Sequence, residues 1–131
     1  MKYYFSRTVS GNFNDIIEEV TGLLKEIGFG VLTSIDVKET LKKKIDVDFK
    51  SYTILGACNP QFAYKAIKAE DKIGTLLPYN VIVIDQGNNN IEVAAMDPVA
   101  MMSQMGNPQL EEIAGQVNEL LKSAIEKIGV K

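Results

Sequence analysis

The chain has 131 residues and a formal net charge of −3, from 14 basic and 17 acidic side chains, and 46% of its residues are hydrophobic. A chain of this size and composition is expected to fold as one domain, residues 1–131, whose core needs no disulfide or metal. Because the sequence has no His and a single Cys, Cys58, it excludes Ser-His and Cys-His nucleophile pairs and multi-cysteine zinc sites within one chain. The composition therefore argues against an enzyme.

No segment of the sequence has the character of a signal peptide or a transmembrane span. The apolar stretches are all far shorter than the roughly 18 residues that cross a bilayer, and one Cys cannot form an internal disulfide. We therefore expect a cytoplasmic protein that does not contact a membrane. The net negative charge argues against a nucleic-acid partner, and one local group of basic residues is interpreted as a solvated helix face: Lys38, Lys42, Lys43, Lys44 and Lys50.

The chain begins with a predicted strand and a long predicted helix. Residues 3–9 are rich in aromatic and β-branched side chains, which favour a strand. Apolar side chains then recur at three- and four-residue spacing over residues 13–27, as in an amphipathic helix. Asn12 or Asn14 is suited to capping the start of this helix, and Gly28 is suited to ending it.

The middle of the chain predicts two further strands, each followed by a short helix. Residues 29–37 alternate with a period of two, which indicates a strand. Asp36 is suited to capping a short helix over residues 38–45. Residues 51–58 form the next predicted strand, and residues 60–68 the next helix.

The last third predicts a hairpin and a long helix. Residues 81–84 read as a strand that is apolar on both faces, and residues 91–96 as the strand that returns from a turn at 87–90. Asn107 and Pro108 then suit the cap and the first residue of a long amphipathic C-terminal helix.

This order of elements predicts an α+β two-layer sandwich, with a mostly antiparallel sheet of about five strands and two long helices packed on one face. Two helices can cover only one face, yet the third and fourth strands are apolar on both, so we expect a second copy of the chain to cover the other face. Cover by the chain's own short helices or by residues 73–77 is the alternative. Alternate residues of these two strands point to opposite faces. The apolar residues of one set are Ile54, Cys58, Ile82 and Ile84, and those of the other set are Leu55, Ala57, Val81 and Val83.

The junction Cys58-Asn59-Pro60 is the most informative candidate site. Asn59 suits the cap of the following helix, and Pro60 suits its first turn. Cys58 then lies just before a helix N-terminus, a position that lowers the pKa of an accessible thiol and whose free N–H groups bind anions. The alternative is that Cys58 is a small, buried apolar residue.

Three further residues are candidates for ligand binding: Tyr79 and Asn80, which open the fourth strand, and Asp97, which is suited to capping a short helical connection. No metal site is predicted. A nearby group of methionines has the soft sulfur atoms that Cu(I) prefers, but filling gaps in the core is the favoured interpretation: Met96, Met101, Met102 and Met105.

Three motifs, at residues 54–60, 74–83 and 96–98, resemble in this order the domain of unknown function 302 family. The resemblance covers nearly the whole chain and implies a small α+β domain of TATA-binding-protein-like architecture, a homodimer, and no established activity. Family members often carry a Cys where this chain has Tyr79, so a two-cysteine redox or metal site does not transfer. The motif positions that do transfer are Cys58, Asn59, Pro60, Leu77, Pro78, Asn80, Asp97 and Pro98.

We therefore predict a noncatalytic, homodimeric module of the cytoplasm that binds a small ligand or a partner near Cys58-Asn59-Pro60. One alternative is a redox or transfer enzyme that uses the Cys58 thiol, and another is a purely structural protein-interaction dimer. No cofactor can be named from the sequence.

Overall fold

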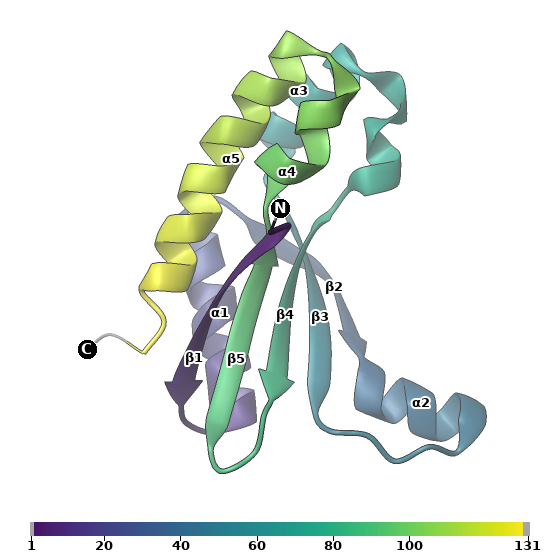
Figure 1. Cartoon of the computed structure of the whole chain (residues 1–131), viewed down its shortest axis with the longest axis vertical. Coiled ribbons are helices and arrows are strands. Elements are labelled where there is room, and N and C mark those ends of the chain that lie inside the picture. The colour runs from purple at the N-terminus through teal and green to yellow at the C-terminus, as the bar shows by residue number, and fades with distance from the viewer. Residues whose placement is uncertain (1, 130–131) are drawn as a thin grey trace.

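The computed structural model describes residues 2–129 and is built around one five-stranded sheet (Figure 1). Residues 1, 130 and 131, which the single-domain prediction includes, lie outside the described residues. The strand order is β1-β5-β4-β3-β2, and each neighbouring pair is antiparallel. The strands are β1 (Tyr4–Ser10), β2 (Gly30–Asp36), β3 (Tyr52–Cys58), β4 (Tyr79–Asp85) and β5 (Asn90–Met96).

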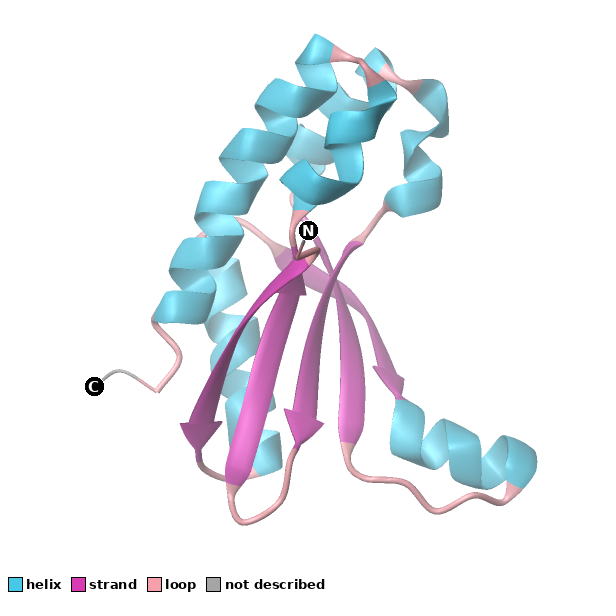
Figure 2. Ribbon diagram, viewed as in Figure 1, coloured by secondary structure: helices cyan, strands magenta, loops and turns pink. Residues whose placement is uncertain are grey.

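The two long helices, α1 and α5, lie on one face of this sheet (Figure 2). The predicted α+β architecture is therefore confirmed, with an antiparallel sheet throughout. The helices are α1 (Phe13–Glu26), α2 (Val37–Ile45), α3 (Pro60–Ala69), α4 (Pro98–Met102) and α5 (Pro108–Glu126), together with the 3-10 helices η1 (Asp71–Leu76) and η2 (Ser103–Met105).

Helix starts follow the predicted capping residues. Asn12, rather than Asn14, caps α1, where its side chain accepts hydrogen bonds from the backbone N–H groups of Asn14 and Asp15. Asp36 caps α2 through the N–H of Glu39 at 3.0 Å. Such side-chain oxygens satisfy donors that the first helical turn leaves free, which explains why local sequence located these starts.

The core lies between the two long helices and the face of the sheet that they cover. The buried strand residues on this face pack in one cluster with Val20 and Leu24 of α1 and with Val117 and Leu121 of α5. Among them are Leu55, Ala57, Val81, Val83, Val93 and Ala95, each at most 2% exposed.

Residues 73–77 join this core instead of covering the other face. Ile73 of η1 is buried in the core cluster, and Leu76 and Leu77 pack against it. The short helices α3 and α4 lie beyond the upper end of the sheet, so the second face carries no helix of residues 2–129 (Figure 2). We call this second face the open face.

Candidate functional site

All six sequence-predicted site residues lie at one end of the sheet, where β3 and β5 end and β4 begins. Cys58 is the last residue of β3, and Asp97 follows β5 directly. Tyr79 and Asn80 open β4, opposite Ala57 and Gly56 of β3. Antiparallel pairing thus gathers residues from distant segments, although their side chains point to different sides.

Asn59 and Pro60 form the start of α3. The Asn59 side-chain oxygen accepts hydrogen bonds from the backbone N–H groups of Gln61 at 3.0 Å and Phe62 at 3.2 Å. Pro60, the first helical residue, has no N–H to offer. The donors that the sequence offered to an anionic ligand are therefore already satisfied within the chain.

Cys58 is half-buried at the end of β3. Burial raises the pKa of its thiol above the ordinary value of 9.0, because a low-polarity environment disfavours the thiolate. The prediction that the following helix N-terminus lowers the pKa of Cys58 is therefore wrong. At neutral pH the sulfur is present as the weakly nucleophilic thiol.

Gly56, two residues before Cys58, lies at a point where the side chains of Thr33 and Pro78 cover the open face. A Cβ atom at Gly56 would lie 2.7 Å from the Cγ atom of Pro78 and would also collide with the hydroxyl of Thr33. The backbone of β3 is therefore tightly covered at this point.

Tyr79 belongs to the core and not to the open face. It is 1% exposed, and its ring packs edge-on against Phe29, with centroids 6.2 Å apart. Its hydroxyl has no hydrogen-bond partner among residues 2–129. Burial, with a smaller contribution from Cys58, raises the pKa of Tyr79 to about 12.

Asp97 connects two helices. Its Oδ1 atom accepts a hydrogen bond from the N–H of Val99 at 2.9 Å, which caps α4, and another from the Nδ2 group of Asn118 in α5 at 2.7 Å. This carboxylate therefore caps α4, as predicted, and it also holds α4 against α5, which the sequence did not indicate.

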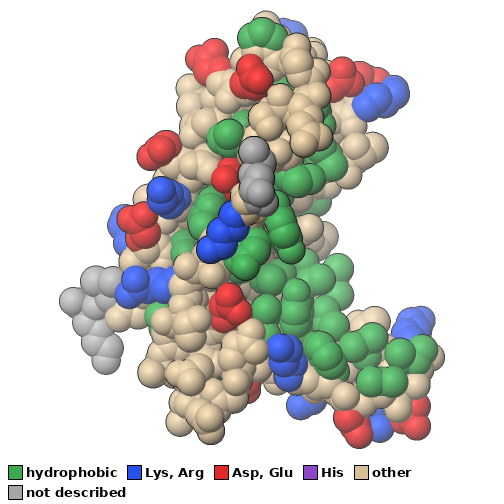
Figure 3. Space-filling model, viewed as in Figure 1, with side chains coloured by type: hydrophobic (Ala, Val, Ile, Leu, Met, Phe, Trp, Pro, Cys, Tyr) green, Lys and Arg blue, Asp and Glu red, His purple; other side chains and the backbone are tan. Residues whose placement is uncertain are grey.

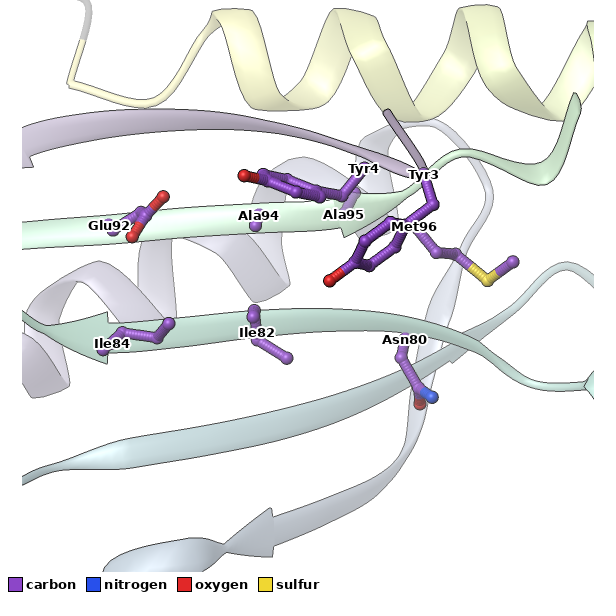
Figure 4. A pocket seen from close by; sticks show the side chains of 9 residues that line it. All are labelled: Tyr3, Tyr4, Asn80, Ile82, Ile84, Glu92, Ala94, Ala95 and Met96. Atoms are coloured by element: carbon purple, nitrogen blue, oxygen red, sulfur yellow. The ribbon is translucent and has the colours of Figure 1, made fainter. Parts of the chain in front are cut away.

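Asn80 is the candidate residue that lines a cavity. A groove of about 320 Å³ runs along the open face (Figure 4), with polar Asn80 towards one end and Glu92 towards the other and apolar side chains between them. It is lined by Tyr3, Tyr4, Asn80, Ile82, Ile84, Glu92, Ala94, Ala95 and Met96. Sequence reasoning missed Tyr4, because the pairing that places it opposite Met96 joins segments far apart in the sequence, and it did not identify the β5 residues that the β4–β5 hairpin brings into the groove.

Glu92 is held at its end of the groove by a short polar chain. The Nε2 group of Gln86 donates a hydrogen bond to Glu92 at 2.9 Å, and the Nζ group of Lys50 donates one to Gln86 at 3.0 Å. Lys50 belongs to the segment that follows α2, so these two hydrogen bonds connect the groove to that segment.

Residues 37–50, which we call the arm, project from the lower end of the sheet (Figure 1). The arm comprises α2 and the segment after it, and α2 has no buried residue. Hydrophobic side chains nevertheless remain exposed on it: Ile45 at 62%, Val47 at 40% and Phe49 at 40%. Figure 3 shows hydrophobic side chains running from the open face onto the arm, on the same side of the molecule.

Across residues 2–129, no three His, Cys, Asp or Glu side chains are grouped so that they could hold a metal ion. None of the helices in this range combines the length and the apolar character needed to cross a bilayer.

The chain matches, over residues 5–128, the protein family described as "Domain of unknown function DUF302". It is also similar to a solved structure, the crystal structure of uncharacterized conserved protein DUF302 from Bacillus stearothermophilus. The two chains are 30% identical and superpose with a TM-score of 0.89, over 98% of this chain and 99% of the other. No curated protein matches this chain.

Proposed function

Because this chain belongs to the DUF302 family, whose description assigns no activity, we propose a function from its own geometry: a noncatalytic module that works as a homodimer joined through the open face. The observation that carries this proposal is the open face itself, which presents apolar residues with no covering helix. Ile54 of β3 and Ile82 of β4 face each other there across the strand pair, and Ile35 of β2 is 48% exposed beside them. Exposed apolar surface of this kind favours association.

A second copy is the occupant that this face suits best. Twofold symmetry brings the same patch of each copy together, so apolar residues meet apolar residues without a second specialised surface. Two sheets can pack face to face with their inner side chains interdigitated. The strand dimensions give the open face an area of about 400 Å², which is about half of what each partner buries in a stable interface.

Ligand binding is a second candidate function, and the groove is the observation that favours it. Its apolar centre suits a small apolar molecule, and Asn80 and Glu92 offer hydrogen-bonding groups for a polar end. A second copy packed on the open face would cover the groove and exclude water from such a ligand. Asn80 lies one strand away from the Cys58-Asn59-Pro60 junction, so we centre the ligand-binding proposal on Asn80.

The geometry supports a thiol enzyme less well. The pKa of Cys58 is raised rather than lowered, and the chain has no His to serve as its base. A purely structural dimer differs from a ligand-binding one only in whether the groove is occupied. The cytoplasmic location and the TATA-binding-protein-like architecture stay predictions.

The oligomeric state in solution tests the proposal. We expect analytical ultracentrifugation to give twice the monomer mass for the wild-type chain, and the Ile82→Asp variant to weaken the dimer at least tenfold. Ile67→Asp is the matched control, because Ile67 is a 43% exposed isoleucine on α3, away from the open face. A wild-type chain that stays monomeric at millimolar concentration, or an Ile82→Asp variant that associates as tightly as the control, would overturn the proposal.

A further inference from the structure

The arm is ordered mainly by local interactions, and its contacts with the sheet are few: α2 touches β2 and β3, and Lys50 donates one hydrogen bond to Gln86. Asp36 caps α2, and Lys42 and Lys43 form ion pairs with Asp46 and Glu39, each at 2.9 Å. These pairs are exposed to solvent, where ion pairs contribute little. A helix of nine residues is too short to be stable on its own in water, so we infer that α2 needs a packing partner that the single chain does not supply.

The apolar side chains of the arm are continuous with the open face. The ring of Phe49 lies 6.4 Å from that of Tyr52, the first residue of β3. Tyr52 pairs with Ile84 of β4, which lines the groove. The arm therefore extends the same apolar surface beyond the edge of the sheet, on the side shown in Figure 3.

We propose that the arm of each copy packs across the open face of the other, so that the two copies grip each other reciprocally. This inference rests on the proposed homodimer and specifies how its interface is completed. The open face alone offers about half of the roughly 800 Å² per partner that a stable interface needs. The exposed apolar side chains of the arm are the surface next to it that can supply the rest.

The dimensions of the arm fit this role. Nine helical residues span about 13 Å, and the five strands of the sheet span about 19 Å. An arm that leaves the edge of one sheet can therefore cross most of the width of a second.

Charge also favours a second copy. The groove has one charged lining residue, Glu92, whereas α2 carries Lys38 and Lys44, which form no ion pair among residues 2–129, beside the ion-paired Lys42 and Lys43. A basic helix laid over this groove would place positive charge near a carboxylate. An anionic membrane is a weaker match, because Glu39, Asp46 and Asp48 alternate with the lysines along the arm.

Cross-linking between copies tests the proposal directly. In a Cys58→Ser background, one copy carries Phe49→Cys on the arm, and a second, affinity-tagged copy carries Asn80→Cys or Thr8→Cys. Asn80 and Thr8 are exposed positions near opposite ends of the open face, so either orientation of the arm can be detected. The control pairs Phe49→Cys with Ile67→Cys on α3.

We expect a short bismaleimide to link the arm to at least one open-face position about fivefold more efficiently than to the control position. Equal linking to all three positions would overturn the inference. Linking only between two Phe49→Cys arms would also overturn it, because the arms would then pack on each other instead of on a sheet.

A second measurement separates the arm from the sheet face. The double variant Ile45→Asp with Phe49→Asp changes exposed residues only, so the monomer should keep its circular dichroism spectrum while the dimer dissociates at least tenfold more readily. If the double variant dimerises as tightly as the wild type while Ile82→Asp weakens the dimer, the proposed role of the arm is overturned and the proposed function stands. A monomeric wild type would overturn the proposed function itself.

The same double variant tests the membrane as an occupant. We expect neither it nor the wild-type chain to sediment with vesicles that contain phosphatidylserine. If the wild type sediments with the vesicles and the double variant does not, and the double variant still dimerises normally, then the arm binds a membrane and its proposed packing on a second copy is overturned.

Discussion

The two faces of the sheet are made by alternate residues of the same strands, yet helices cover only one of them. On the covered face, Leu55 and Val81 pack under α1 and α5 and are at most 2% exposed. On the open face, their neighbours Ile54 and Ile82 are partly exposed and have no helix above them. The difference shows that one chain supplies enough helix for one face only.

Truncating neighbouring residues of β3 gives the largest expected contrast between the faces. Leu55→Ala should lower the free energy of unfolding by about 3 kcal/mol, because it opens a cavity in a packed core. Ile54→Ala, the matched change on the open face, should cost the monomer less than about 1 kcal/mol, because partly exposed sites can relax or admit water. Urea unfolding at low protein concentration measures both values. Equal losses would mean that the open face is packed as tightly as the core.

Removing the hydroxyl of Tyr79 should give a smaller effect, in the stabilising direction. A buried hydroxyl without a partner costs about 1–3 kcal/mol, so Tyr79→Phe should raise the free energy of unfolding by about 1 kcal/mol. Tyr52→Phe, on the open face, should change it little. A loss of stability in Tyr79→Phe would show that the hydroxyl has a hydrogen-bond partner, such as an internal water.

The pH dependence gives a second readout for Tyr79. The pKa of its hydroxyl is about 12 in the folded chain, above the ordinary 10.0, so the folded state keeps a proton that the unfolded state releases between these values. Its contribution to stability is therefore complete below pH 10 and is lost as the pH rises towards 12. Between pH 10 and 12, the free energy of unfolding should fall more steeply with pH for the wild type than for Tyr79→Phe.

The smallest effect concerns Cys58, the half-buried last residue of β3. Because burial raises the pKa of its thiol, alkylation by iodoacetamide at pH 8 should be slower than for a free cysteine and should accelerate when urea unfolds the chain. The rate should still be rising with pH at the ordinary thiol pKa of 9.0 and should level off only above it, because the rate follows the thiolate fraction. Fast alkylation at neutral pH would instead support the thiol-enzyme alternative.

Local chemistry made most of the elements predictable. Asn12, Asp36, Asn59 and Asn107 each accept backbone hydrogen bonds at a helix start where the sequence placed a cap. Element ends set by pairing were less accurate: β2 spans Gly30–Asp36 rather than residues 29–37, because its outermost pairs are those of Gly30 with Cys58 and of Asp36 with Thr53 of β3. A single strand does not contain that information.

The candidate site was predictable as a region but not as a cavity. The end of the sheet that carries Cys58, Asn80 and Asp97 was identified from motifs and caps. The groove needed Tyr4 and Glu92 as well. Glu92 lies opposite Ile84 in the predicted hairpin of β4 and β5, whereas Tyr4 reaches the groove only through the pairing of β1 with β5. Nothing in the local sequence around Tyr4 records that pairing.

The sequence by itself determined the class of fold, the places where helices begin, and the fact that β3 and β4 are apolar on both parities. Only the tertiary structure decided which parity is covered. Alternation fixes that Tyr79 and Asn80 point to opposite sides, but it does not say which side the helices occupy. That choice depends on where α1 and α5 pack against the assembled sheet, and it places Tyr79 in the core and Asn80 in the groove.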